Sequence, residues 1–306
     1  MSNLVSVQVL TWNNYNDTKK LLLSSRNLNY DNFKVTIVDN HSKDDSIKRL
    51  KSEFPDYEYL INSENQKYSG GTNFGIKNSS YNDSKYLFLL NNDTEIVDPE
   101  TLNKLTSILD NYPEIMVVGC RAVYPDGSAQ IDAAKLFFPG ILNFILRESL
   151  PAVVIHKIRN KLRRNNKDSK LFKIVDWVPT GVTLFRKEVF NKVIFNNDFP
   201  MEFSDVEFCK RVRVSFGGGV ALSNVKIVHT NNFPSHIEKS IKNFLRAKRA
   251  EFLYIKLYNH RAYYLLYKFF VFTNSLLLLV ILSPLSIKNT NNRMRLLNYF
   301  NLLKGF

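Results

Sequence analysis

A group of oxygen-bearing side chains follows a short apolar run near residue 90. Tyr86–Leu90 carries no charge, which is typical of a strand buried on both faces of a sheet, and Asn91, Asn92 and Asp93 follow it directly. On an extended chain, Asn91 and Asp93 would point the same way and offer one neutral and one charged oxygen to a hard cation. This incomplete set suits Mg²⁺ or Mn²⁺, whose other positions are filled by water and phosphate. A capped turn before a helix near Pro99 is the alternative interpretation.

Three further apolar runs also end at polar side chains. They are Val5–Leu10, which ends at Thr11 and Asn13; Phe33–Val38, which ends at Asp39 and Asn40; and Val220–Val228, which ends at His229. Because the carboxyl ends of parallel strands share one edge of a sheet, all four polar ends are predicted to meet there. Asp39 is placed to accept a hydrogen bond from a ribose hydroxyl or a base N–H, or, alternatively, to cap a helix.

Two other segments carry candidate chemistry. Asn65–Gly75 places Gly70 and Gly71 in a predicted loop before a helix near Thr72–Asn78, where backbone N–H groups would face phosphate or sugar oxygens. The segment matches neither the dinucleotide-binding glycine pattern nor the P-loop, which disfavours a dehydrogenase or a kinase.

Met201–Arg211 is a second acidic centre. Asp205 and Glu207 lie at the start of a predicted helix over Asp205–Phe216, an arrangement that ordinary helix starts also show. In the functional interpretation, Asp205 is a general base that takes the proton of a sugar hydroxyl.

The elements that carry these residues alternate between strand and helix. Further predicted elements are helices from Asp17 or Thr18 to about Leu28, from Asp44 or Asp45 through Phe54, over Pro99–Asn111 and over Lys187–Val193, and strands over Tyr57–Ile61 and Met116–Val123. Residues 124–175 are less regular, and 175–185 return to strand and turn. This alternation predicts a doubly wound α/β sheet.

Composition limits the class of protein. The chain has 306 residues, 44% of them hydrophobic, which is enough for one large domain with an appendage. Its two cysteines are far apart, which argues against a disulfide scaffold or a zinc site and favours a reducing compartment. No signal peptide is evident, because the first apolar segment is predicted to be a strand.

The net charge of +14 is concentrated in the second half. Residues 1–150 hold 15 Lys or Arg and 19 Asp or Glu, whereas residues 151–306 hold 27 and 9. This asymmetry predicts an anionic partner, either nucleic acid or a phospholipid surface. No RNA-binding, zinc-finger or homeodomain signature is present, so nucleic acid is the weaker interpretation.

The C-terminal region favours a membrane. The nineteen residues Phe269–Ile287 carry no charge and are long enough to cross a bilayer, to lie in its plane or to form a buried helix. Lys239–His260 mixes basic and apolar residues as lipid-binding amphipathic helices do, and His156–Lys173 is also basic. A substrate linked to a polyprenyl diphosphate, which combines phosphate with a lipid chain, would account for both the basic and the apolar segments.

In their order along the chain, these motifs resemble the inverting GT-A glycosyltransferases of family 2, in the branch of bacterial rhamnosyltransferases. The resemblance covers roughly residues 4–235. The matching motifs are Val5–Asn13 with Asn16, Val38–Asn40 with Ser42, Asn65 with Gly70–Gly71, Asn73 and Gly75, Leu90–Asn91 with Asp93–Thr94, Tyr124–Gly127 with Gln130, Asp176–Trp177 with Thr180–Gly181, and Asp205 with Glu207, Cys209 and Arg211 or Arg213.

The resemblance implies a role for each matching position. Asp205 would be the catalytic base, and Asp93, Asn91 and His229 would hold Mg²⁺ or Mn²⁺ against the donor diphosphate. The nucleotide-sugar, a dTDP- or UDP-sugar, would contact Thr11, Asn13, Asp39, Asn40, Gly70, Gly71, Asn73, Asn91 and Asn92. The acceptor would lie along Trp177, Thr180, Gly181, Ser204 and Glu207. Two positions depart from the pattern: Asn91 stands for an Asp, and Ser204 for the usual Glu.

The sequence thus predicts a GT-A domain over residues 1–235 and a helical membrane-associating extension over 236–306. Within the domain, residues 1–115 would bind the nucleotide-sugar and 116–235 the acceptor. The expected activity is inverting transfer of rhamnose from dTDP-rhamnose to a glycan or lipid-linked acceptor in surface polysaccharide synthesis, at the cytoplasmic face of the membrane. A UDP-galactofuranose or UDP-N-acetylhexosamine enzyme, a catalytically impaired relative, and a basic nucleic-acid-binding protein are the alternatives.

Overall fold

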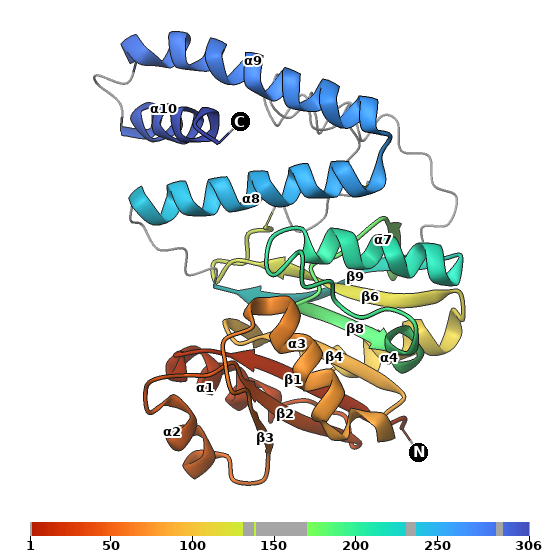
Figure 1. Ribbon diagram of the computed structural model, residues 1–306. Coiled ribbons are helices and arrows are strands. Elements are labelled where there is room, and N and C mark those ends of the chain that lie inside the picture. Colours follow the sequence, from red (N-terminus) through yellow and green to blue (C-terminus); the bar gives the residue numbers. More distant parts are fainter. Residues whose placement is uncertain (1, 131–137, 139–169, 231–236, 286–289, 306) are drawn as a thin grey trace. The chain divides into compact units, whose positions relative to one another are not determined.

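The computed structural model describes residues 2–130, 138, 170–230, 237–285 and 290–305. The chain divides into two compact units (Figure 1). The described part of the first unit comprises residues 2–130, 138 and 170–230, and that of the second comprises 237–285 and 290–305.

The first unit is built on one mixed sheet of nine strands within its described residues, in the order β3-β2-β1-β4-β8-β6-β9-β5, with β7 paired to β9. The strands are β1 (Val5–Thr11), β2 (Phe33–Asp39), β3 (Glu58–Ile61), β4 (Tyr86–Asn91), β5 (Thr94–Ile96), β6 (Ile115–Val123), β7 (Phe172–Val175), β8 (Val182–Arg186) and β9 (Gly219–His229). Six of these strands run parallel, whereas β5, β7 and β8 run antiparallel to their neighbours. The predicted α/β sheet is therefore confirmed, and both halves of the predicted domain contribute to it.

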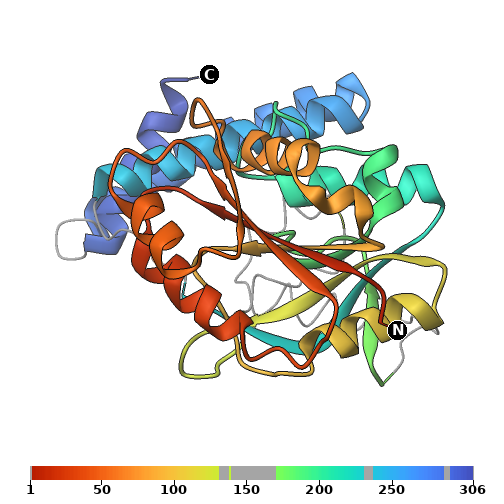
Figure 2. The ribbon, with the colours of Figure 1, turned by 90° about the horizontal axis from the view of Figure 1, so that it is seen from below.

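Helices cover both faces of this sheet. They are α1 (Tyr15–Ser25), α2 (Ser46–Glu53), α3 (Lys67–Asn78), α4 (Thr101–Asn111) and α7 (Ser204–Phe216), with two short 3₁₀ turns, η1 (Ser80–Asp83) and η3 (Lys187–Asn191). The apolar residues of α1, α2 and α4 pack on one face of the sheet, and those of α3, η3 and α7 pack on the other (Figure 2).

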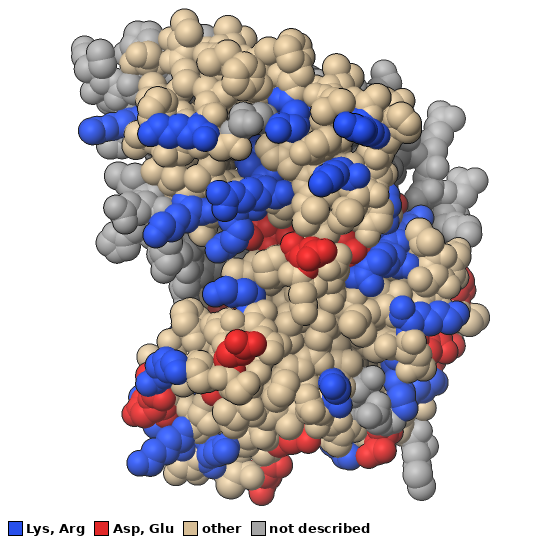
Figure 3. Space-filling model, in the orientation of Figure 1, with Lys and Arg blue, Asp and Glu red and all other residues tan. Residues whose placement is uncertain are grey.

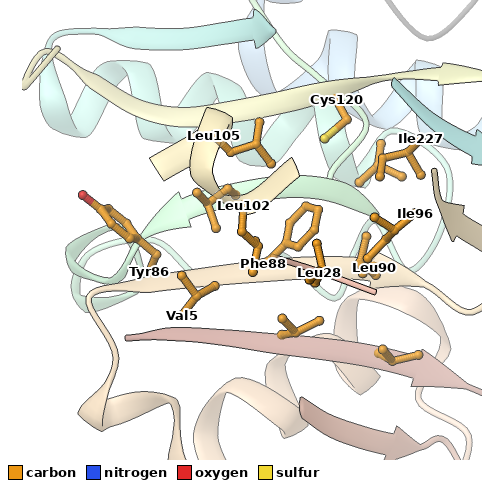
Figure 4. Packing of buried hydrophobic residues seen from close by; sticks show 14 of the residues in the cluster. Val5, Leu28, Tyr86, Phe88, Leu90, Ile96, Leu102, Leu105, Cys120 and Ile227 are labelled. Carbon is orange, nitrogen blue, oxygen red and sulfur yellow. The ribbon is translucent and has the colours of Figure 1, made fainter. Parts of the chain in front are cut away.

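The alternation of the central strands explains this two-sided core. In β4, Tyr86, Phe88 and Leu90 point into the first cluster, while Leu87 and Leu89 point into the second. Figure 4 shows the first cluster, in which Phe88 lies among side chains from β4, α4 and neighbouring strands. Because both faces are covered, β4 has the uninterrupted apolar sequence of a fully buried strand.

Several elements differ from their predicted form. The segment Lys187–Asn191 forms a 3₁₀ turn instead of an α-helix, and β5 was not predicted, because its three residues are too short to give a periodic pattern. Helix α3 begins at Lys67, five residues before the predicted start, so Gly70 and Gly71 lie inside a helix and not in a loop. The predicted basic segment His156–Lys173 lies largely outside the described residues.

The glycines of α3 allow the helix to approach the sheet closely. A Cβ atom on Gly75 would lie 2.6 Å from Gln8 of β1 and 2.6 Å from Val38 of β2. Both neighbours are buried, and Gln8 is also held by its hydrogen bond to the Thr72 carbonyl. Neither can move aside without disturbing the sheet.

In its described residues the second unit has three helices, α8 (Ile237–Tyr258), α9 (Arg261–Leu285) and α10 (Thr290–Leu303), which pack on one another. The segment Arg261–Val280 of α9 has the length and the mean hydropathy, 1.5, of a membrane-spanning helix, and only 17% of its apolar window is buried. Among the described residues it is the only helix with these properties. Figure 3 shows Lys and Arg side chains gathered over the face of this unit that is turned to the reader.

Replacement of Gly75 by Ala is expected to lower the free energy of unfolding by about 1–3 kcal/mol, because the added methyl group overpacks the contact between α3 and the sheet. This loss runs against the gain of about 1 kcal/mol that Ala brings to an ordinary helix interior. Urea unfolding measures the difference. Lys77→Ala, on the exposed side of the same helix, is the control; an unchanged or raised stability of Gly75→Ala would contradict the packing argument.

Candidate active site

The carboxyl ends of β1, β2 and β4 lie at one edge of the sheet. The parallel register pairs Thr11 with Asp39 and Leu10 with Asn91, so the predicted polar ends of these strands are brought together. The loops that follow are also joined: the Asn13 backbone N–H donates to Ser42 Oγ, and Asn13 Oδ1 accepts from the Lys43 backbone N–H. These bonds hold the loop after β1 against the loop after β2.

Asp39 and Thr11 are fixed within this edge. The buried Asp39 carboxylate accepts a hydrogen bond at 3.0 Å from the backbone N–H of Ser42, three residues further along the chain. Thr11 Oγ1 lies 2.8 Å from Thr18 Oγ1, and the Asn92 side-chain amide donates to both hydroxyls at 3.3 Å. Asn92 therefore ties the end of β4 to the end of β1.

Asp93 and His229 form the next part of the edge. Asp93 Oδ1 lies 3.1 Å from His229 Nε2, and both side chains are partly exposed. The pairing of β5 with β9, which places Thr94 opposite His229, holds the two side chains together. Gln130 adds a further restraint, because its side-chain amide donates to the His229 carbonyl.

The chain turns at Asn92 and Asp93 between β4 and β5, so the extended chain predicted for residues 91–93 is wrong. The role of Asn91 as a metal ligand stays a prediction. The Asn91 side chain packs on Gly181, where a Cβ atom would come within 2.3 Å of Asn91 Oδ1. The Asn91 backbone N–H also donates to the Gly181 carbonyl. Gly181 thus provides the space for Asn91.

The carboxylate of Asp205 is attached to the same region through Thr180. Both the backbone N–H and the hydroxyl of Thr180 donate to Asp205 Oδ1. Thr180 directly precedes Gly181, so the contact that positions Asn91 and the contact that positions Asp205 lie on adjacent residues. Ser204 and Asp205 begin α7, where the free N–H groups of the helix favour a carboxylate.

Burial raises the pKa of Asp205 above its usual range, while the two hydrogen bonds from Thr180 and the nearby His229 act in the opposite direction. A carboxylate with a raised pKa is a better proton acceptor than an ordinary Asp at neutral pH. The electrostatic influence of His229 on Asp205 indicates that the Thr180–Asp205 pair lies near the Asp93–His229 pair.

Backbone strain is concentrated around this site. Among the described residues other than glycine, Asn13, His41, Lys67 and Phe203 have positive φ angles of 49°, 67°, 61° and 63°. Asn13 and His41 follow β1 and β2, Lys67 begins α3, and Phe203 precedes the α7 start that carries Asp205. Such conformations cost about 1–3 kcal/mol each and persist where the surrounding contacts determine them. All four lie in segments that adjoin the predicted site residues.

Several predicted nucleotide-sugar residues have a structural role. The side-chain amide of Asn73 makes two hydrogen bonds to the Phe195 backbone, and that of Asn40 is occupied by Asn62, Asn65, Gln66 and Lys67. Gly70 and Gly71 lie in α3, whose close packing on Gln66, Leu10 and Asn40 leaves no space for a side chain. The predicted phosphate-binding glycine loop is therefore absent from this segment.

Some of the predicted acceptor residues also have a structural role. Glu207 is buried and makes a two-point ion pair with Arg211, so its charge is compensated within the helix. Ser204 Oγ donates to the Met201 carbonyl. Trp177 Nε1 is buried, and none of the described residues accepts a hydrogen bond from it. Of this group, only Thr180 contacts Asp205 directly.

A divalent cation fits the Asp93–His229 pair. Ligands at right angles on an octahedral ion, each about 2.1 Å from the metal, lie about 3 Å apart, which matches the 3.1 Å between Asp93 Oδ1 and His229 Nε2. No cluster of three or more His, Cys, Asp or Glu side chains that could hold a metal exists in the described part of the chain. A cation here would need further ligands from a diphosphate and water, as Mg²⁺ and Mn²⁺ usually have.

Two residues of the site were not singled out from the sequence. The Tyr68 hydroxyl lies 2.8 Å from Thr180 Oγ1, so Tyr68, Thr180 and Asp205 form a hydrogen-bonded chain. Trp12 is 52% exposed directly after β1, beside Thr11 and Asn13. The aromatic character of Trp12 within a polar strand end was the available signal; the role of Tyr68 depends on a contact across 112 residues and had none.

This fold and this site define a GT-A glycosyltransferase. The model of "Glycosyl transferase family 2" matches residues 6–194, more than half of the chain, and the chain belongs to that family. It is 26% identical over 214 residues to the O-antigen biosynthesis protein RfbC of Myxococcus xanthus. That alignment covers 65% of this chain but only 15% of the relative, so the chain spans a small part of the curated protein it matches.

Solved structures share the fold. The mannosyltransferase PcManGT from Pyrobaculum calidifontis, in complex with GDP-Man and Mn²⁺, superposes with a TM-score of 0.58 and 13% identity, over 98% of this chain and 86% of that one. S. aureus TarS 1–349 in complex with UDP-GlcNAc superposes with a TM-score of 0.52 and 15% identity, over 79% and 66%. The predicted GT-A fold and the glycosyltransferase family are thereby confirmed.

Replacement of Thr180 by Val is expected to move the acidic limb of the pH–rate profile to higher pH. The Thr180 hydroxyl stabilises the ionised form of Asp205, so its loss raises the pKa of that carboxyl further. The profile of kcat/KM between pH 5 and 9 measures the shift. Thr183→Val is the matched control, because the Thr183 hydroxyl donates to the Pro179 carbonyl and not to Asp205. Equal profiles for both variants would exclude this role of Thr180.

Proposed function

We propose that this glycosyltransferase acts by a single inverting displacement in which Asp205 is the general base. The observation that carries the proposal is the Thr180–Asp205 contact, which fixes a carboxylate whose pKa is raised by burial and on which His229 acts electrostatically. A base that must remove the proton of a sugar hydroxyl requires this combination of fixed position and raised pKa.

The proposed reaction begins with the acceptor hydroxyl against Asp205. The hydroxyl oxygen forms the new bond to the anomeric carbon as Asp205 takes its proton. The bond from that carbon to the diphosphate breaks, and the nucleoside diphosphate leaves with the electron pair. The backbone N–H and hydroxyl of Thr180 keep the carboxylate in one orientation during this step. Fixing both reactants in line supplies much of the acceleration.

Asp93 and His229 would hold a divalent cation, which when bound neutralises charge on the leaving diphosphate. The imidazole favours Mn²⁺ over Mg²⁺, because Mg²⁺ prefers oxygen ligands. Asp39 would accept from the nucleoside, and the exposed Trp12 would stack on its base. These assignments place the donor along the ends of β1, β2 and β4.

The proposed donor is dTDP-rhamnose, and the proposed acceptor is a glycan or a polyprenyl-diphosphate-linked glycan in bacterial surface polysaccharide synthesis. The order of motifs that resembles the rhamnosyltransferase branch supports the donor. The likeness to an O-antigen biosynthesis protein supports the pathway class. UDP-galactofuranose and UDP-N-acetylhexosamine are the competing donors. Release of nucleoside diphosphate from a panel of these donors, with membrane extract as acceptor, distinguishes them; faster release from a UDP-sugar would overturn the rhamnose assignment.

We also propose that the enzyme works at the cytoplasmic face of the membrane, attached through its second unit. Residues 236–306 contain twelve Lys or Arg and two Asp or Glu, and the apolar segment of α9 is largely exposed. A basic and apolar surface of this kind suits anionic lipid better than nucleic acid. This explains the charge asymmetry of the chain without a nucleic-acid partner.

Asp205→Asn is expected to lower kcat by about 10²–10⁴-fold or more, because the amide cannot accept the proton. The dissociation constant of the nucleoside diphosphate, measured by calorimetry, should remain nearly unchanged. Glu207→Gln is a matched control, since its carboxylate lies on the same helix and is paired with Arg211. Retained turnover in Asp205→Asn would remove Asp205 from the role of base.

His229→Ala is expected to raise the Mn²⁺ concentration for half-maximal activity by about 10–100-fold, a loss typical of a disturbed metal site. Titration of activity with Mn²⁺ measures the change. His260→Ala, in the turn between α8 and α9, is the control. If the two variants require the same Mn²⁺ concentration as the unaltered enzyme, His229 does not serve the cation.

A further inference from the structure

The second unit contains a cavity of about 320 Å³ between its three helices. Arg249 and Lys256 of α8 and Lys268 of α9 supply three cations to its lining, while Leu245 and Phe252 of α8 supply apolar surface. None of the described residues that line it is Asp or Glu. A cavity that combines several positive charges with apolar walls has the character of a binding site for an amphipathic anion.

The helix repeat explains how the lining is assembled. Residues 245, 249, 252 and 256 are spaced by three or four positions, so they share one side of α8. Tyr264 and Lys268 are four apart on α9 and also line the cavity. Cationic and apolar side chains therefore alternate along one wall, which lets a charged group and a hydrocarbon group bind side by side.

The acidic residue of α8 nearest in sequence to the cavity cations is Glu251, which interacts with other side chains of α8 and α9. The Glu251 side chain is buried, accepts a hydrogen bond from the Tyr267 hydroxyl and forms an ion pair with Lys248 at 3.4 Å. Lys248 and the Tyr267 hydroxyl thus offset its charge. The described lining of the cavity, with three cations and no acid, has the excess of positive charge that an anion site requires.

The exposed surface of helix α9 indicates which kind of molecule carries the anionic group. Large apolar side chains spaced by three or four residues are exposed along it, among them Phe269 at 64%, Leu277 at 57% and Val280 at 73%. An exposed apolar stripe of this length is typical of a lipid-facing helix. Because Lys268 of the cavity directly precedes Phe269 of the stripe, the anion site and the apolar stripe belong to the same turn of α9.

We propose that the cavity between α8, α9 and α10 binds the phosphate headgroup of a membrane lipid. Arg249 would contact the phosphate with its guanidinium fork, and Lys256 and Lys268 would add point charges. The hydrocarbon chains would lie along the apolar wall and the stripe of α9. The inference rests on the proposed attachment of the second unit to the membrane and names the site of that attachment. It is separate from the transfer reaction, so each can fail without the other.

The test compares two triple variants of the full chain that lose the same charge. Arg249→Gln/Lys256→Gln/Lys268→Gln removes the cations of the cavity, whereas Lys242→Gln/Arg261→Gln/Arg293→Gln removes three exposed cations of the same helices that do not line it. Binding is measured by co-sedimentation with phosphatidylcholine vesicles that contain either 20% phosphatidic acid or 20% of a cationic lipid, at a fixed ionic strength of about 0.15 M. Inorganic phosphate and inorganic diphosphate serve as soluble competitors.

The proposal expects binding only to the phosphatidic acid vesicles, with at least tenfold weaker affinity for the cavity variant and less than a threefold change for the control variant. Equal losses in both variants would show diffuse surface attraction and overturn the proposal, as would unchanged binding of the cavity variant. Complete competition by millimolar inorganic phosphate would assign the cavity to a soluble anion instead of a lipid. Circular dichroism establishes that each variant is folded, and the single variant Arg249→Gln replaces the triple variant if that protein unfolds.

Discussion

The antiparallel insertion of β8 between β4 and β6 is the constraint on which the site depends. In a purely parallel sheet, the residues before each strand lie at the edge opposite the ligand. Because β8 runs the other way, the residues before it, Thr180 and Gly181, lie at the carboxyl edge together with the ends of β1, β2 and β4. Thr180 can then hold Asp205 while Gly181 receives Asn91.

A second antiparallel pair completes the arrangement from the other end of the sheet. The three-residue strand β5 returns immediately after β4 and pairs with the end of β9, so that Asp93 meets His229. The two carboxylates of the proposed chemistry, Asp93 and Asp205, are therefore placed by two local reversals of chain direction. Their surroundings account for their different proposed roles. Asp93, the proposed cation ligand, is partly exposed beside an imidazole, and Asp205, the proposed base, is desolvated beside a hydroxyl.

The site is held at a cost to stability. Burial of the Asp205 carboxylate disfavours its ionised form, and four residues other than glycine around the site adopt left-handed backbone conformations. The two-sided apolar core offsets these terms, with α1, α2 and α4 on one face and α3 and α7 on the other. The second unit follows a different principle, because its apolar residues are arranged along α9 largely on the outside. The partner proposed for its cations is an anionic lipid surface.

The local part of the fold was predictable from the sequence. The strands β1, β2 and β4 and helix α7 have clear apolar runs or caps, and their polar ends were correctly expected at one edge, since parallel strands leave no other arrangement. The prediction of a glycine loop was wrong, because it was made from the local sequence pattern and did not consider how the helix packs on the sheet. Gly70 and Gly71 suggested a phosphate-binding loop, but the glycines serve the close approach of α3 to the sheet. Asn73 hydrogen-bonds to the Phe195 backbone and Glu207 to Arg211 on the next helical turn, and their predicted ligand contacts stay predictions.

By itself, the sequence determined the class of the fold, the family and the identity of the acidic residues, because these depend on residue types and on their spacing along the chain. Only the tertiary structure decided which of those residues meet. The contacts Asp93–His229, Tyr68–Thr180 and Thr180–Asp205 join residues 136, 112 and 25 positions apart. In the same way, the packing of α8 against α9 brings cations from two helices to one cavity. Such contacts are set by strand direction and helix packing, which no local pattern encodes, and they determine which carboxylate is desolvated and which is paired.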